Sequence, residues 1–168
     1  HKPVHNSAAF GFAKASDLVK VFQGVQPGFV YGRQGTPTSA ALEEKITRME
    51  QGFQTIGFSS GMGAISATLL ALLRAGDHLV SSRFLFGNTT SLFETFARMG
   101  VEVTFVDATD AANVEAAIRP ETRMVFVETI ANPRTQVSDL EGIGRICQAR
   151  GLVYVVDNTI TSPFLFLP

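Results

Sequence analysis

Short apolar runs alternate with stretches of helical periodicity along most of the chain, and this alternation limits the possible folds more than any other feature. The apolar runs predict strands at 55–59, 78–81, 101–106, 124–127 and 152–156. The periodic stretches predict helices at 38–51, 62–73, 89–98, 110–118 and 140–150. Strands that are apolar throughout and separated by helices indicate a parallel sheet covered on both faces. The predicted fold class is therefore α/β, with a mostly parallel sheet and helices on both faces.

Residues 1–37 lack this alternation, because glycine and proline interrupt any long element there. The interrupting residues are Gly11, Gly24, Pro27, Gly28, Gly32, Gly35 and Pro37. A segment of this length without its own structure is uncommon in a compact domain and often has a functional or subunit-contacting role. We predict an irregular N-terminal arm at 1–37, which contacts a neighbouring subunit, and an α/β domain at 38–168.

The composition gives no support to several classes of function. The net charge is −1 and there is no basic run, so nothing indicates a nucleic acid or a membrane surface as a partner. No apolar stretch reaches the roughly 18 residues that a membrane span needs. Cys147 is the only cysteine, which excludes an internal disulfide and fits a cytoplasmic protein. The scattered His1, His5 and His78 predict no metal site.

The last seven residues, S-P-F-L-F-L-P, are separated from the end of the last predicted strand by five residues. An α/β domain rarely ends on exposed apolar side chains without a covering helix. We expect the natural protein to continue beyond Pro168. The alternative is a short apolar tail that docks on its own domain.

Two segments offer groups suited to a phosphate. The turn from Ser59 to Gly63, S-S-G-M-G, opens into a predicted helix, whose first N–H groups and positive dipole end suit an anion. Tight turns also use glycine for steric reasons, so a purely structural role stays open. Tyr31 and Arg33 lie among glycines in the arm, where an arginine either binds phosphate or is simply solvated.

Other candidate residues follow the predicted strands, at the edge where open parallel sheets bind ligands. Asp157 ends an apolar run, and a buried carboxylate there needs a partner such as a cation or a protonated ring nitrogen. A helix cap or a solvated turn is the alternative. Glu128 and Asn132 follow the preceding strand, so we expect them beside Asp157 on the same edge. Phe86 offers a ring that stacks on a flat ligand or packs in the core.

Four stretches, in this order, resemble the cystathionine-synthase-type family of pyridoxal-phosphate enzymes: Y-G-R-Q-G-T-P-T, S-S-G-M-G-A, E-T-I-A-N-P and V-V-D-N-T. The family includes cystathionine synthases and lyases, methionine γ-lyase and the O-acylhomoserine sulfhydrylases. The resemblance covers residues 30–168. It implies the large domain of the aspartate-aminotransferase-like, fold type I enzymes in truncated form, with pyridoxal 5′-phosphate as cofactor.

The resemblance implies how the cofactor phosphate is bound. Tyr31 and Arg33 match the pair that reaches the phosphate in the neighbouring subunit, so it implies a homo-oligomer, a tetramer built from dimers that share active sites. Gly61 and Met62 match the backbone donors to the phosphate.

The resemblance also implies how the cofactor ring is held. Phe86 matches the ring-stacking position, and Thr159 packs on the opposite ring face. Asp157 matches the carboxylate that keeps the pyridine nitrogen protonated. Asn132 lies near the cofactor hydroxyl and the substrate carboxylate.

Two departures from the family pattern bear on activity. The family's Schiff-base lysine lies in an S-x-x-T-K stretch beyond Pro168, so the cofactor-binding domain at 38–168 is incomplete and the chain alone is predicted to be inactive. Phe86 stands where lyases and synthases usually carry tyrosine. The L-F-G sequence at this place is similar to that of sulfhydrylases that use O-succinylhomoserine.

The resemblance therefore implies a γ-replacement on O-acylhomoserine, a small amino-acid substrate, in which a sulfur nucleophile gives homocysteine. Cystathionine γ-synthase and γ-lyase activities of the same family are the alternatives. A non-catalytic α/β nucleotide-binding module is an alternative of a different class, although such a module has no reason to carry the Tyr31 and Arg33 arm.

Overall fold

The computed structural model describes residues 2–168 and divides into two compact units, one ending at Gly57 and the other running from Phe58 to Pro168. The sequence predicted a division at 37/38 instead. The physical reason is that the arm is tied to the helix that follows it: the His5 N–H donates to Thr38 Oγ1 at 2.8 Å, and Lys2 pairs with Glu44.

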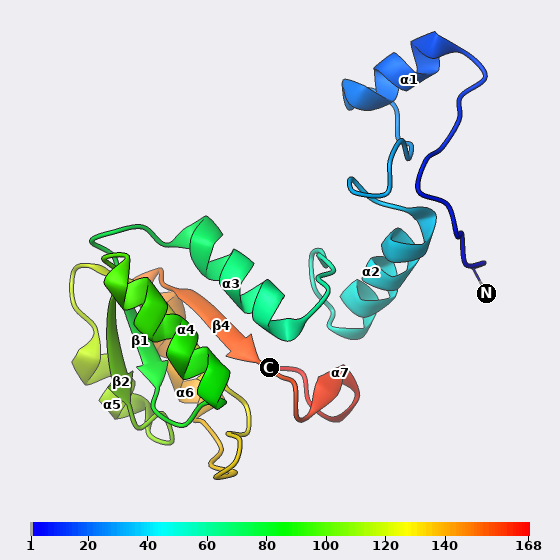
Figure 1. The fold of residues 1–168 in the computed structure, drawn as a ribbon. Helices are drawn as coiled ribbons and strands as arrows, with labels where there is room; N and C mark the ends of the chain where they lie inside the picture. The colour runs from blue at the N-terminus through cyan, green and yellow to red at the C-terminus, as the bar shows by residue number, and fades with distance from the viewer. Residues whose placement is uncertain (1) are drawn as a thin grey trace. The chain divides into compact units, whose positions relative to one another are not determined.

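A four-stranded parallel sheet forms the centre of the second unit (Figure 1). Its strands are β1 (His78–Ser82), β2 (Glu102–Val106), β3 (Thr122–Glu128) and β4 (Val153–Asp157). They lie in the order β2-β1-β3-β4, and all three pairings are parallel. The α/β class and the parallel sheet predicted from the apolar runs are confirmed.

Helices cover both faces of this sheet (Figure 1). One face carries α3 (Gly61–Leu72) and α4 (Gly87–Arg98), and the other carries α5 (Ala111–Ala117) and α6 (Leu140–Arg150). Successive strand residues point to opposite faces. Leu79 and Phe126 accordingly pack under α3 and α4, whereas Val80 and Val125 pack under α5 and α6.

Cys147 of α6 is buried in the second of these clusters. Burial raises the pKa of its thiol to about 11. The thiolate is the reactive form of cysteine, so this side chain is poorly suited to be a nucleophile at neutral pH.

The predicted strand at 55–59 is not formed, which corrects the sequence analysis. Its residues are irregular and mostly exposed, and the Gly57 N–H donates to Glu43 Oε1 at 2.9 Å instead of to a neighbouring strand. A strand needs a partner for its backbone, and the local apolar pattern does not reveal whether one is available.

The N-terminal arm is not irregular throughout, which is a second correction. It contains α1 (Ala15–Phe22), and the arm is followed by α2 (Pro37–Met49). The first helix forms in the glycine-free stretch between Gly11 and Gly24. The second begins with a capping box, in which Thr36 Oγ1 accepts from the Ser39 N–H at 3.1 Å.

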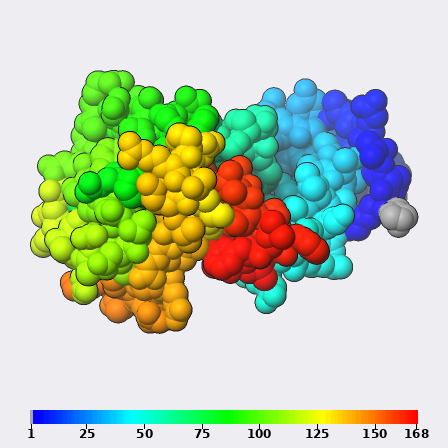
Figure 2. Space-filling model, turned by 90° about the horizontal axis from the view of Figure 1, so that it is seen from below, coloured from blue at the N-terminus to red at the C-terminus, as the bar shows by residue number. Residues whose placement is uncertain are grey.

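The segment after β4 contains the short helix α7 (Ser162–Leu165) and lies on the surface (Figure 2). Phe164 and Leu165 are 87% and 72% exposed, so the apolar residues do not dock on the sheet as the alternative interpretation of this segment required.

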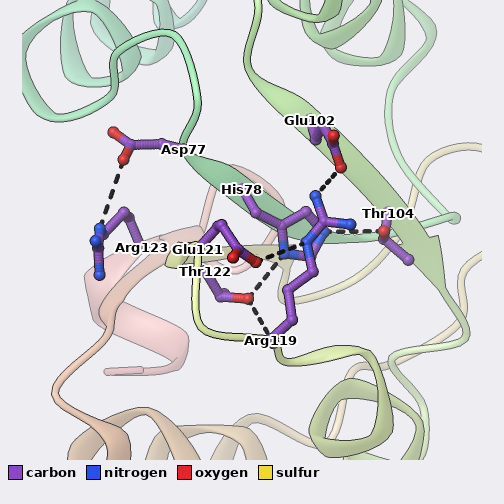
Figure 3. A network of polar contacts seen from close by, with 8 residues as sticks. All are labelled: Asp77, His78, Glu102, Thr104, Arg119, Glu121, Thr122 and Arg123. Carbon is purple, nitrogen blue, oxygen red and sulfur yellow. Dashed lines mark hydrogen bonds and ion pairs between the residues drawn. The ribbon is translucent and has the colours of Figure 1, made fainter.

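A buried histidine joins three strands at the edge of the sheet opposite to the carboxyl ends (Figure 3). His78 of β1 is fully buried, with Nδ1 2.8 Å from Thr122 Oγ1 of β3 and Nε2 2.9 Å from Thr104 Oγ1 of β2. The Thr122 hydroxyl also accepts from the Arg119 N–H, which leaves its hydrogen for His78 Nδ1. A neutral imidazole with its hydrogen on Nε2 satisfies this whole network.

This histidine is expected to make stability depend on pH. Burial, with a smaller contribution from the positive Arg119, lowers the pKa of His78 below 6.5 in the folded state. The unfolded chain therefore takes up a proton before the folded protein does, and stability falls as the pH drops from about 6.5 toward the folded pKa. Chemical denaturation between pH 5 and 8 measures this slope.

His78→Gln is expected to remove that part of the slope, and His5→Gln, which changes an exposed histidine, is expected to retain it. An unchanged slope in His78→Gln would show that other groups cause it. The difference in pH dependence between variant and wild type isolates the contribution of His78, because the carboxyl groups contribute equally to both proteins.

Candidate active site at the carboxyl edge of the sheet

A cavity of about 190 Å³ opens beyond the carboxyl ends of β3 and β4. Its lining residues are Phe86, Glu128, Ile130, Asn132, Asp157, Thr159 and Ile160. Four residues that the sequence analysis named for the cofactor ring, Phe86, Asn132, Asp157 and Thr159, are thus brought together. The cavity lies where open parallel sheets bind ligands.

Asp157 ends β4 and lies beside Glu128, its partner in the register of β3 and β4. One carboxylate oxygen, Oδ1, accepts from the Thr159 N–H at 3.0 Å and from the Thr159 hydroxyl. In the described chain, Oδ2 makes no hydrogen bond or ion pair. The turn therefore fixes one oxygen and leaves the other available to a ligand.

Glu128 is 5% exposed, and both of its carboxylate oxygens accept from backbone N–H groups. Oε1 accepts from Phe86 at 2.7 Å, and Oε2 accepts from Asn132 at 3.4 Å. Burial raises the pKa of Glu128, and the negative Asp157 adds to this effect, while the two hydrogen bonds oppose it. The sequence analysis placed Glu128 beside Asp157, and the strand register confirms this.

Phe86 lies between β1 and α4, and 45% of its surface is exposed. Its ring is therefore not part of the core, which was the alternative interpretation of this residue. An aromatic ring at the wall of a cavity offers a face to a flat ligand.

Gly61 and Met62 begin α3 in the same unit but do not line the cavity. Their N–H groups donate to no acceptor among residues 2–168, because the Ser60 side chain caps only the Gly63 N–H, at 3.0 Å. The Thr89 hydroxyl lies 3.9 Å from Met62 Sδ and connects this turn to the first turn of α4, which follows Phe86. The turn therefore leaves two N–H groups without an acceptor in residues 2–168 at a helix start, an arrangement that suits an anion, and their role at a cofactor phosphate stays a prediction.

Tyr31 and Arg33 lie in the first unit, where the Arg33 guanidinium carbon is 5.1 Å from the centre of the Tyr31 ring. Both are exposed, and the backbone around them is held by a bridge to Ala9, in which the Gly32 N–H donates to the Ala8 carbonyl at 2.7 Å. Their role at a cofactor phosphate stays a prediction.

Sequence reasoning missed two apolar lining residues, Ile130 and Ile160. Each lies inside or next to a recognised stretch, E-T-I-A-N-P for the first and V-V-D-N-T for the second. Ile130 lies two residues after Glu128, and Ile160 lies three residues after Asp157. This closeness in sequence would have been enough to predict both as lining residues.

The chemistry of the cavity fits a protonated, flat nitrogen heterocycle. Two carboxylates line it and no lysine or arginine does, so it favours a cation and disfavours an anion. Its volume lies below the usual range of about 300–1,000 Å³ for ligand sites, so its size suits a single ring better than a whole cofactor.

Residues 2–168 contain no group of three or more His, Cys, Asp or Glu side chains placed to hold a metal ion. None of their helices has the length and apolar character needed to span a bilayer.

Comparison with known proteins identifies relatives of the same kind. An L-methionine gamma-lyase of Fusobacterium nucleatum is 40% identical over 168 residues, covering 99% of this chain and 42% of the relative. An O-succinylhomoserine sulfhydrylase of Pseudomonas aeruginosa is 37% identical over 163 residues, covering 96% of this chain and 40% of the relative. The chain thus spans about two fifths of the length of the relatives it matches.

A solved structure confirms the fold. The putative O-acetylhomoserine (thiol)-lyase of Campylobacter jejuni, which contains N′-pyridoxyl-lysine-5′-monophosphate, superposes with a TM-score of 0.91 at 30% identity, over 99% of this chain and 42% of the other. The model of the family described as Cys/Met metabolism PLP-dependent enzyme matches residues 1–168. The geometry of the cavity, the fold and this match agree, and the chain belongs to the Cys/Met metabolism family of PLP-dependent enzymes.

Proposed function

We propose that the chain is part of an enzyme that replaces the acyl group of an O-acylhomoserine with a sulfur nucleophile and so forms homocysteine. Family membership supports pyridoxal-phosphate chemistry on a small amino acid. The two relatives named above, a lyase and a sulfhydrylase, are 40% and 37% identical to this chain. Overall similarity therefore does not distinguish elimination from replacement.

The absence of a hydroxyl group on the ring of Phe86 favours replacement of an acyl group. Its ring forms a wall of the cavity but carries no hydroxyl to protonate a leaving group. A carboxylate leaves without protonation, because a carboxyl pKa is about 4, whereas a thiolate benefits from a proton donor, because a thiol pKa is about 8.5. An acyl leaving group thus fits this site better than the thiolate that a methionine γ-lyase must expel.

Each side chain of the site has a role in this proposal. Pyridoxal phosphate, when bound, supplies an electron sink for the carbanions of the amino acid. Asp157 Oδ2 holds the proton on the ring nitrogen, while Thr159 keeps the carboxylate in place. Phe86 stacks on one ring face and Thr159 packs on the other. The amide of Asn132 lies near the cofactor hydroxyl and the substrate carboxylate.

The phosphate is held by groups outside the cavity in this proposal. Gly61 and Met62 donate backbone N–H groups, assisted by the positive end of the α3 dipole. Tyr31 and Arg33 reach the phosphate of a neighbouring subunit, which makes the enzyme a homo-oligomer, a tetramer of paired subunits.

The covalent anchor of the cofactor is proposed to lie outside these residues. The four lysines of the chain, Lys2, Lys14, Lys20 and Lys45, all lie in the first unit, and the unit that contains the cavity has none. A Schiff-base lysine in the full-length enzyme, beyond Pro168, completes the site in our proposal, and residues 1–168 alone are expected to be inactive.

Product analysis tests the proposed reaction. The full-length enzyme is expected to form homocysteine from O-acylhomoserine and sulfide, and to form little 2-oxobutyrate from methionine. Phe86→Tyr introduces a proton donor and is expected to raise elimination from methionine about tenfold or more, since a positioned general acid contributes about 10²–10⁴-fold. Rapid elimination from methionine by the wild type, without homocysteine formation, would establish the lyase alternative instead.

A further inference from the structure

We propose that Glu128 is a positioning residue, whose buried carboxylate holds together the two loops that form the walls of the cavity. One loop carries Phe86 and the other carries Asn132. This inference rests on the proposed function, since it concerns how the site holds the cofactor ring.

The burial of Glu128 has no explanation in an ion pair. The residue is 5% exposed, and in residues 2–168 no lysine, arginine or histidine forms a salt bridge with its carboxylate. Burying a carboxylate is costly unless hydrogen bonds compensate. The compensating donors are the backbone N–H groups of two separate loops. These two hydrogen bonds offset the free-energy cost of burying the carboxylate.

The contact with Phe86 takes the role that the N3 side chain has in a capping box, which is to accept from the N–H of the N-cap residue. Phe86 is the N-cap residue of α4 and has no side chain that can cap the helix. Its own N–H donates to Glu128 Oε1 at 2.7 Å, a distance typical of charge-assisted hydrogen bonds, across 42 residues of sequence. Because the helix start is fastened to β3, the ring of Phe86 is set relative to the strand that lies beside Asp157.

The second oxygen of Glu128 fastens the other wall. Oε2 accepts from the Asn132 N–H at 3.4 Å, which is a weaker contact. The side-chain amide of Asn132 makes no hydrogen bond within the described chain and is left to face a ligand in the cavity. One carboxylate thus sets both the stacking ring and the amide.

The rival hypothesis is that Glu128, which lies beside Asp157, adds negative charge near the ring nitrogen. Two substitutions separate the roles. Glu128→Gln keeps the length and an acceptor for the Phe86 N–H but loses the charge. Glu128→Asp keeps the charge but is one methylene shorter, so it no longer reaches that N–H.

The test is a titration of the full-length protein with pyridoxal phosphate, with visible circular dichroism of the bound cofactor as a report on ring orientation. Positioning predicts that Glu128→Asp weakens cofactor binding about tenfold and changes the dichroism band. It predicts that Glu128→Gln stays within about threefold of wild type and keeps the band. The same two changes at Glu94, an exposed glutamate of α4, are the matched control and are expected to alter neither.

The opposite order, with Gln damaging and Asp harmless, would overturn the positioning role in favour of charge. Equal behaviour of both variants and wild type would overturn it as well. Thermal unfolding of each variant identifies a general loss of stability, which would lower the melting temperature without changing the dichroism band of the protein that remains folded. No substrate enters this test, so a failure of the proposed γ-replacement is seen separately, in product analysis of the wild type.

Discussion

Asp157→Asn is expected to lower the turnover of the full-length enzyme about 100-fold. In the proposed site, Asp157 Oδ2 pairs with the protonated ring nitrogen, and an opposite charge at this range shifts a pKa by about 1–3 units. Each unit corresponds to about tenfold in the protonated fraction, so loss of the charge weakens the electron sink by roughly the middle of that range. Asparagine still accepts from the Thr159 N–H, so the turn itself is retained.

Asp107→Asn is a closely matched control for this change. Asp107 follows β2 in V-D-A-T as Asp157 ends β4 in V-V-D-N-T, and its Oδ1 accepts from the Thr109 N–H at 3.1 Å and from the Thr109 hydroxyl at 2.6 Å. The two turns are alike, but Asp107 does not line the cavity. Steady-state kinetics and the absorption spectrum of the bound cofactor compare the variants. Equal losses at both positions would show that the turn matters and the ring nitrogen does not.

The sheet and the cavity at its edge were predictable because both depend on order along the chain. Each apolar run from residue 78 onward became a strand of one parallel sheet, and parallel strands bring their carboxyl ends to the same edge. Asp157 and Glu128 are therefore neighbours by register, although they lie 29 positions apart in the sequence. The apolar pattern of each run was sufficient to predict a strand, since each of these strands pairs with another strand of the same sheet.

Contacts that depend on loop conformation were not predictable in this way. The 55–59 run has the composition of a strand but no strand beside it, and its glycine bonds to a glutamate side chain instead. Glu128 was placed at the correct edge, yet its hydrogen bond to the Phe86 N–H depends on how the turn before α4 folds. Local periodicity does not predict these contacts. It indicates which side of an element a residue faces, but not the conformation of the loop opposite that residue.

Phe93→Ala is expected to lower the free energy of unfolding by about 3–5 kcal/mol, the range for truncation of a buried phenylalanine. Phe93 of α4 is fully buried and meets Phe126 of β3 edge-on, with ring centres 5.1 Å apart and planes at 86°. Removal of the ring leaves a cavity between the helix and the sheet and also loses the aromatic pair.

Urea denaturation measures this change, with Phe53→Ala as the control, because Phe53 is fully exposed and its loss is expected to cost less than about 0.5 kcal/mol. A loss below about 1 kcal/mol for Phe93→Ala would show that the core closes around the missing ring. The packing of Phe93 also bears on the site, since α4 begins directly after Phe86 and is held at one end by Glu128 and along its length by Phe93. A variant that loosens the helix body but keeps the Glu128 contact should lose stability and retain the orientation of the cofactor ring, whereas Glu128→Asp should change that orientation.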